Sequence, residues 1–277
     1  TLTTLTTLTT LTTATTIPAV PTVPSPVVAP LDMSPDSFDD RYQGCGRAMA
    51  AALPSLNRSE LRGQWAEAWA LAMAEWRVRR SPAVSPLSPA QAVALLSYTA
   101  PLPLHRTFNA AVRSSGRSGR DYRERFPFKT LHFLLTTALA TLRDSGGRRC
   151  HRVFRGVRGV RFRARPGQRV RFGHFASASL RNESARSFGS DTWFQVSTCQ
   201  GAAIRHFSFF PHEEEVLIPP FETFQVTAVT NVTDVTDGAS RDAAGTVSIE
   251  LRSEGTYSRY NCEWLRGDSR GHLGRDR

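Results

Sequence analysis

The chain has 277 residues, with 35 Lys and Arg against 24 Asp and Glu, and a formal net charge of +11. Its hydrophobic fraction of 40% is enough for one substantial core, and the length suits one large domain or two small ones. No run approaches about 18 uninterrupted apolar residues, so the sequence excludes a membrane-spanning helix.

Arginine carries nearly all of the positive charge, because Lys129 is the only lysine. Such a charge is typical of proteins that bind nucleic acids or acidic surfaces, but a coding bias toward arginine would produce the same composition. The four cysteines allow three pairings, and their even number suits an oxidising compartment. A zinc site is not expected, because no C-x-x-C pair occurs.

The first thirty residues differ from the rest of the chain. Leucine recurs every third residue from Leu2 to Leu11 with threonine between, and a proline-rich run extends from Ile17 to Pro30. A three-residue period drifts around a helix, and prolines stop it, so this segment cannot present one apolar helical face. The pattern predicts a disordered segment over 1–30, typical of an O-glycosylated stalk. Neither a signal peptide at the start nor a hydrophobic lipid-anchor tail at the end is evident.

The patterns from 36 to 143 are helical. One apolar stripe recurs at spacings of three and four, and it comprises Leu61, Trp65, Trp69, Ala72, Met73 and Trp76. Ser88 followed by Pro89 and Gln91 predicts a capping box that begins the next helix. A shorter stripe covers 104–112, and a strong one covers 131–142 before the glycine pair at 146–147.

The period changes to two after Cys150. Strands are predicted over 151–156, 169–177, 192–198, 214–218, 221–230 and 246–252. Helices followed by strands indicate an α+β domain and not alternating βαβ units. We expect one domain over 31–266, followed by a disordered, arginine-rich tail over 267–277.

The densest charge cluster extends from Arg148 to Arg171 and contains ten arginines and no acid. A nucleic-acid site is one interpretation. However, Arg161, Arg163 and Arg165 alternate with apolar residues, and side chains two apart share one face of a strand. The alternation therefore favours a solvated face in which most of these arginines contact water.

Three adjacent carboxylates, Glu213, Glu214 and Glu215, precede the apolar run at 216–218. If the strand geometry already begins there, Glu213 and Glu215 project on one side of it. Two carboxylates on one side can stabilise a developing oxocarbenium ion and accept a proton from an acceptor. A solvated strand end is the alternative interpretation of this trio taken alone.

Two further motifs carry weaker indications. Ser177 and Ser179 are two residues apart near a strand end, where hydroxyls can orient a ligand amide or a carboxylate, or satisfy a turn. Arg155 with Gly156 can place a guanidinium on a phosphate and leave the backbone open to a planar ring. We expect His174, His206 and His212 to be structural or surface residues, because their spacing does not suit a metal site.

The order of Arg155, then Ser177-x-Ser179, then Glu213-x-Glu215 resembles the arginine–serine–glutamate pattern of ADP-ribosyltransferases of the cholera-toxin-like type. More closely, the chain resembles the vertebrate arginine-specific ecto-ADP-ribosyltransferases. The matching motifs are FDDRYQGC at 38–45, FPFK at 126–129, LHFLLT at 131–136, VFRG at 153–156, FASASL at 175–180 and EEEVLIPPFE at 213–222. They span nearly all of 31–266.

The resemblance implies two packed, mainly antiparallel β-sheets that enclose a cleft for NAD, with no metal. On the cofactor side, Arg155 would contact the phosphates and the backbone of Gly156 would hold the nicotinamide amide. Ser177 would position nicotinamide and the catalytic glutamate, with Ser179 in support. Phe188 would stack on the nicotinamide ring.

The resemblance also implies the reaction. Glu215 would be the catalytic glutamate, and Glu213 would bind and help to deprotonate the guanidinium of the acceptor. The expected activity is transfer of ADP-ribose from NAD to arginine side chains of proteins, with release of nicotinamide and without a specific nucleic-acid partner. The alternatives are an NAD glycohydrolase, in which water replaces the acceptor, and a non-catalytic basic protein that binds polyanions.

The same resemblance resolves the cysteine pairing as Cys45–Cys262 and Cys150–Cys199. It implies a secreted or extracellular protein. In such a protein, three sequons would be glycosylation acceptors, at Asn57, Asn182 and Asn231.

Overall fold

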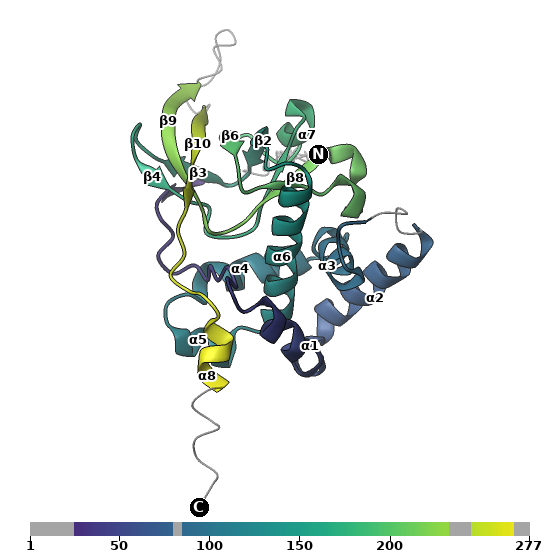
Figure 1. Ribbon diagram of the computed structural model, residues 1–277. Coiled ribbons are helices and arrows are strands. Elements are labelled where there is room, and N and C mark those ends of the chain that lie inside the picture. The colour runs from purple at the N-terminus through teal and green to yellow at the C-terminus, as the bar shows by residue number, and fades with distance from the viewer. Residues whose placement is uncertain (1–24, 80–84, 233–244, 269–277) are drawn as a thin grey trace, which may run out of the picture.

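The computed structural model describes residues 25–79, 85–232 and 245–268 (Figure 1). The threonine–leucine repeat and residues 269–277 of the arginine-rich tail lie outside the described residues. No helix among the described residues is long and apolar enough to span a membrane.

The first half of the chain is helical, as its apolar stripes predict. The helices are α1 (Gly46–Glu60), α2 (Gly63–Val78), α3 (Pro89–Thr99), α4 (Leu104–Ser114), α5 (Gly119–Arg125) and α6 (Lys129–Ser145). The capping box at the start of α3 is confirmed, with Ser88 and Gln91 bonded reciprocally. In α2 the stripe differs at one position, because Met73 is exposed whereas Ala68 is buried. Ala68 lies three and four residues from Trp65 and Ala72, so the buried face passes through it.

The second half contains the strands, which gather above the helices in Figure 1. They are β2 (His151–Val157), β3 (Val160–Arg163), β4 (Arg169–Val170), β5 (Ala176–Ser179), β6 (Thr192–Thr198), β7 (Ala202–Ala203), β8 (Glu215–Ile218), β9 (Glu222–Val232) and β10 (Thr246–Thr256). Eight of them form one sheet in the order β4-β9-β10-β6-β2-β5-β8-β7, in which only β6 and β10 pair in parallel among the described strands. The α+β class is confirmed.

The sheet is barely continuous between β2 and β5. These two strands are joined by a single residue pair, Phe154 opposite Ser179, whereas β2 pairs with β6 over its whole length. The expected two sheets therefore take the form of a five-strand part and a three-strand part that diverge from this junction. Their divergence leaves room beside the residues at the end of β5.

The strand expected over 169–177 is wrong as one continuous element. It is divided into β4, which pairs with β9, and β5, which pairs with β8 at the other end of the sheet. Gly173 lies between them with φ of +64°, and its Cα packs against the side chain of Ser34. A residue with a Cβ is strained in that conformation and would collide there, so the chain turns at this glycine.

Most arginines of the cluster at 148–171 are exposed, but Arg171 is an exception to the expected solvated face. Its guanidinium is fully buried and forms an ion pair with Asp39, with Nη1 and Oδ2 at 2.5 Å. It also donates to the backbone carbonyls of Met33, Ser34 and Tyr257. Alternation cannot reveal such a partner, because Asp39 lies far away in the sequence.

The expected boundary at residue 31 also needs correction, because Val27–Pro30 forms strand β1 in parallel with β3. Backbone hydrogen bonds anchor its ends, from Val27 to Gly159 and from Leu31 to Arg163. At the other end, α8 (Glu263–Asp268) extends past the expected boundary at 266. Regular secondary structure therefore reaches beyond both expected boundaries.

The disulfide Cys45–Cys262 and an aromatic core hold the helical and strand halves together, and a second disulfide lies within the strand half. The disulfide Cys45–Cys262 closes 217 residues, and Cys150–Cys199 joins the neighbouring strands β2 and β6. Closing so long a loop contributes about 5 kcal/mol in the chain-entropy model. Phe175, just before β5, packs into the helical core against Phe108, so β5 is fixed to the helices.

Replacing Arg171 by methionine should lower the free energy of unfolding by about 3–5 kcal/mol, because the carboxylate of Asp39 would stay buried without its cation. Urea unfolding with the disulfides intact measures this loss. The control is Arg163→Met on exposed β3, expected to stay within about 0.5 kcal/mol of the native protein. Equal effects of the two substitutions would contradict the structural role of Arg171.

Candidate active site

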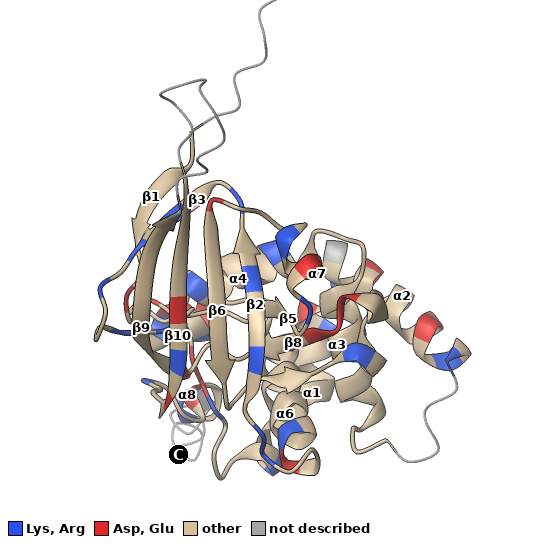
Figure 2. Cartoon of the chain, turned by 90° about the horizontal axis from the view of Figure 1, so that it is seen from above, with Lys and Arg blue, Asp and Glu red and all other residues tan. Residues whose placement is uncertain are grey.

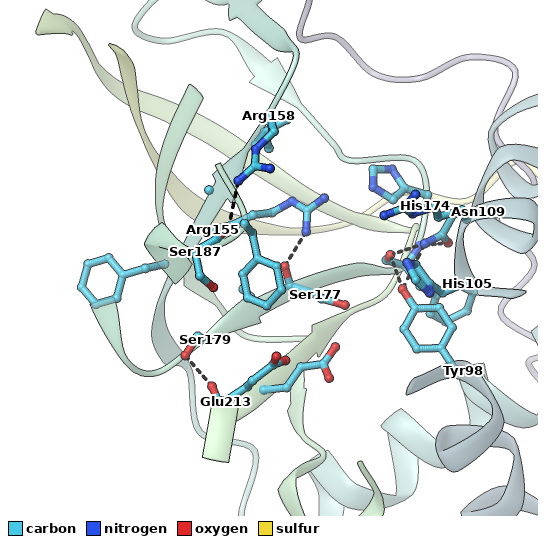
Figure 3. Close-up of a pocket in the computed structure, with 18 of the residues that line it drawn as sticks. Tyr98, His105, Asn109, Arg155, Arg158, His174, Ser177, Ser179, Ser187 and Glu213 are labelled. Atoms are coloured by element: carbon cyan, nitrogen blue, oxygen red, sulfur yellow. Dashed lines mark hydrogen bonds between the residues drawn. The ribbon is translucent and has the colours of Figure 1, made fainter. Parts of the chain in front are cut away.

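A cavity of about 690 Å³ opens at the junction of β2 and β5 (Figure 3). Its lining comes from β2, β5 and the start of β8 on the sheet side, and from α3 and α4 on the helical side. The cavity contains every site residue that the sequence singled out, namely Arg155, Gly156, Ser177, Ser179, Phe188, Glu213 and Glu215.

Glu215 is the first residue of β8, and its side chain is only 6% exposed. Burial raises the pKa of this carboxyl to about 7, because water no longer stabilises the charged form. A hydrogen bond from Ser177 lowers the pKa, the charge of Glu213 raises it, and the charge of Arg155 lowers it. The carboxylate is therefore poised between its two protonation states near neutral pH.

Arg155 lies in the middle of β2, and its guanidinium points toward β5 (Figure 3). Nη1 donates a hydrogen bond to the backbone carbonyl of Ser177 at 2.5 Å. Burial lowers the pKa of Arg155, and so does the charge of Arg113, but a guanidinium keeps its proton at neutral pH. A fixed positive charge therefore lies beside Ser177 and Glu215.

Ser179 fixes the segment that carries Glu213. Its hydroxyl donates to the carbonyl of Glu213 at 2.6 Å and accepts from the N–H of Arg181 at 2.9 Å. The hydroxyl thus forms hydrogen bonds with backbone groups of two loops. Ser179 holds the two loops together at the junction where β2 meets β5.

Glu213 reaches the cavity by a different route from the one its spacing suggests. It ends a 3₁₀ turn, Pro211–Glu213, and Glu214 follows in the left-handed region with φ of 47°. Strand β8 begins only at Glu215, so strand alternation does not bring the two carboxylates together; the turn at Glu214 does. The side chain of Glu214 pairs instead with Arg205, at 3.7 Å. Burial raises the pKa of Glu213.

Gly156 and Phe188 lie where the loop after α7 (Asn182–Arg186) approaches β2. A Cβ on Gly156 would be 2.2 Å from the carbonyl oxygen of Gly189 and 2.5 Å from that of Ala185. Glycine is therefore required for this approach. Phe188 is 49% exposed in the cavity lining.

Helices α3 and α4 contribute side chains to the cavity that the sequence motifs do not indicate. The hydroxyl of Tyr98 donates a hydrogen bond to the carbonyl oxygen of Phe175 at 2.9 Å. The side-chain amide of Asn109 donates to the same carbonyl oxygen and to the hydroxyl oxygen of Tyr98, each at 3.0 Å. Burial raises the pKa of Tyr98 to about 12. A signal was available in the spacing of His105, Asn109 and Arg113, which are four residues apart and therefore share one polar face of α4. Arg113 of α4 also lines the cavity.

His174 is a further correction, since it was expected to be structural or at the surface and it lines the cavity. Its Nδ1 lies 2.7 Å from the carbonyl oxygen of Phe172. Burial and the charges of Arg155 and Arg113 lower its pKa to about 3, so its ring is neutral. Among the described residues, no group of three or more His, Cys, Asp and Glu is placed to hold a metal ion.

The cavity combines four arginines, Arg106, Arg113, Arg155 and Arg158, with two glutamates. Figure 2 shows basic segments of β2 in blue and the acidic segment that leads into β8 in red. Arginines bind anions such as a diphosphate, and a buried carboxylate stabilises positive charge that develops next to it. The arrangement suits an anionic ligand that lies next to a carboxylate able to stabilise positive charge.

Comparison with known proteins shows the family to which the chain belongs. The family model for NAD:arginine ADP-ribosyltransferases matches residues 31–241, and the chain belongs to that family. It is 51% identical over 254 residues to the GPI-linked NAD(P)(+)--arginine ADP-ribosyltransferase 1 of Homo sapiens, covering 85% of this chain and 74% of that protein. The erythroblast NAD(P)(+)--arginine ADP-ribosyltransferase of Gallus gallus is 49% identical over 239 residues, which cover 85% and 76%.

The fold matches the crystal structure of the eukaryotic mono-ADP-ribosyltransferase ART2.2 with a TM-score of 0.69 and 33% identity. The match covers 86% of this chain and 99% of that one. Variants of ART2.2 have been crystallised in complex with NAD and with NADH. The resemblance inferred from the sequence motifs is confirmed.

Replacing Ser177 by alanine should raise the pKa of Glu215 above about 7, because the hydrogen bond that favours the charged form is lost. Replacing Glu213 by glutamine should lower it, because a like charge is removed. Carbon-detected NMR titration of the glutamate carboxyls measures both shifts. Glu214→Gln is the matched control and should leave the pKa unchanged; a shift as large as that of Glu213→Gln would contradict the arrangement.

Proposed function

We propose that this protein is an NAD(+)--protein-arginine ADP-ribosyltransferase, which transfers ADP-ribose from NAD to arginine side chains and releases nicotinamide. The observation that carries the proposal is the buried carboxylate of Glu215 beside Ser177 and Arg155, in a cavity whose volume suits a small-molecule ligand. Membership of the family supports the same activity.

In this proposal the dinucleotide lies with its diphosphate against the arginines of the cavity. Arg155 contacts the phosphates, and Arg113 and Arg158 add positive charge on the same lining. The backbone of Gly156, which lines the cavity, holds the nicotinamide amide. Phe188, half exposed in the lining, stacks on the nicotinamide ring.

The chemical step breaks the bond between the ribose and nicotinamide, which leaves as a neutral molecule with the bonding electron pair. The ribose carbon becomes positively charged, and the ionised carboxylate of Glu215 stabilises it while accepting a hydrogen bond from a ribose hydroxyl. Ser177 supports the ionised form through its hydrogen bond to Glu215. Arg155, held on the carbonyl of Ser177, keeps the diphosphate in place.

Glu213 acts on the acceptor. An arginine guanidinium is almost always protonated in water, so its nitrogen is a poor nucleophile. Glu213 attracts the guanidinium and takes a proton as the nitrogen bonds to the ribose carbon. Burial raises the pKa of Glu213, which strengthens it as a base. A glycohydrolase needs no such group, so Glu213 favours transfer over hydrolysis.

The catalytic domain in this proposal comprises the described residues from β1 to α8. Its partners are NAD and proteins with accessible arginines. An extracellular location accords with two disulfides and with relatives that are named GPI-linked. The names of these relatives favour anchorage at the cell surface over free secretion.

Replacing Glu213 by glutamine should shift the products from ADP-ribosylated agmatine toward free ADP-ribose. Attack by water on the ribose carbon depends less on a base than attack by a protonated guanidinium does. The rate of transfer should fall by about 10²-fold while NAD is still consumed. Separation of the products from labelled NAD by chromatography measures this ratio. Glu214→Gln serves as the control, and full-rate transfer by Glu213→Gln would refute the role of Glu213.

The kcat/KM for NAD should rise with pH up to about 7 and then level off, because the free enzyme needs Glu215 in its ionised form. Below that pH it should fall about tenfold per unit as the carboxylate is protonated. Steady-state rates with agmatine between pH 5 and 9 test this dependence. Glu215→Ala should retain almost no transfer at any pH, and a flat native profile would contradict the need for the anion.

A further inference from the structure

A second cavity of about 470 Å³ adjoins the first. Glu213, Glu215 and Ser177 line both cavities, so the two meet at the carboxylates. The second cavity extends from there along the loop that joins α3 to α4. The residues that line it and not the first are Thr99, Ala100, Pro101, Leu102, Pro103 and Phe210.

The linings of the two cavities differ in chemistry. The first carries four arginines, which suits a diphosphate. The second is mainly apolar, with Leu102 between two prolines and Phe210 on the opposite wall, and Arg106 is its only arginine or lysine among the described residues. Its lining therefore suits an apolar chain and not a second diphosphate, with one cation, Arg106, away from the two carboxylates in the sequence.

Hydrogen bonds connect the two walls of the second cavity. The hydroxyl of Thr99, at the end of α3, accepts from the N–H of Phe209 at 3.2 Å. Arg79, just after α2, donates to the carbonyl of Ser208 at 2.8 Å and pairs with Glu75. The segment that carries Phe210 and Glu213 is thus held against α2 and α3, which preorganises the cavity for a ligand.

We propose, building on the proposed function, that the second cavity binds the acceptor peptide on either side of the modified arginine. The guanidinium must reach Glu213 while the dinucleotide fills the first cavity, so the neighbouring peptide residues enter the second. Leu102 and Phe210 bind an apolar neighbour of the arginine. Arg106 attracts an acidic residue and repels a basic one. The substrates are thus arginines with apolar and acidic neighbours.

Three pentapeptides with a central arginine test this subsite: Asp-Leu-Arg-Leu-Asp, Lys-Leu-Arg-Leu-Lys and Asp-Ser-Arg-Ser-Asp, all blocked at both ends. Their symmetry removes the dependence on peptide direction. The native enzyme should prefer the first over the second by about tenfold in kcat/KM. Arg106→Glu should abolish or invert that ratio. The ratio is taken at one NAD concentration, so any effect of Arg106 on the dinucleotide cancels.

The matched control is Arg158→Glu, which changes the net charge equally but lies only in the first cavity. It should keep the ratio within about twofold of the native value, since long-range attraction falls off with screening. Phe210→Ala should reduce the preference for leucine over serine by about three- to fivefold. This second variant reports on the apolar wall independently of Arg106.

The outcomes separate the subsite from the activity. Equal ratios for Arg106→Glu and Arg158→Glu would overturn the subsite, as would a native enzyme without preference among the peptides. Agmatine, which has no peptide neighbours, reports on the activity alone. If the native protein does not modify agmatine, the proposed function is wrong. If it modifies agmatine but shows no preference among the peptides, only the proposed subsite is wrong.

Discussion

The carboxylate of Glu215 is withdrawn from water at the point where the sheet divides, and two groups oppose the effect of that burial. Burial alone favours the protonated form, which could not stabilise a positive carbon. The hydrogen bond from Ser177 and the charge of Arg155 favour the ionised form and partly offset the effect of burial, so the pKa lies at about 7. A dry, ionised carboxylate stabilises a cation far more than a solvated one, because no water screens it. The proposed chemistry depends on this balance.

The fold maintains the balance through contacts on both sides of β5. Its residues pair with β8 in a register that sets Ser179 opposite Glu215, and its single link to β2 leaves the cavity open. On the helical side, Tyr98 and Asn109 hold the carbonyl of Phe175, immediately before β5. The helices therefore contribute to the site by fixing the strand that carries Ser177, and the long disulfide fixes the helical half to the chain's end.

Much of this could be predicted from the sequence, because local patterns report local structure. Apolar stripes predicted α2, α4 and α6, and the capping box at Ser88 predicted where α3 begins. The motif residues Arg155, Ser177 and Glu215 line one cavity. No stripe marked α1 or α5. The remainder depends on contacts between distant segments. Arg171 alternates like its exposed neighbours, yet Asp39 holds it in the interior. Tyr98 and His174 enter the cavity only because α3 and the β4–β5 loop converge there, which no local period encodes. The left-handed Glu214, not strand alternation, turns Glu213 inward.

The most direct test is a crystal structure with a carbocyclic NAD analogue. Its carbocyclic ring cannot form an oxocarbenium ion, so the bond to nicotinamide stays intact. We expect the carboxylate of Glu215 to accept a hydrogen bond from a hydroxyl of the nicotinamide-side ring, with the diphosphate against Arg155. A complex in which that ring lies beyond hydrogen-bonding distance of Glu215, with the carboxylate facing only protein groups, would contradict it.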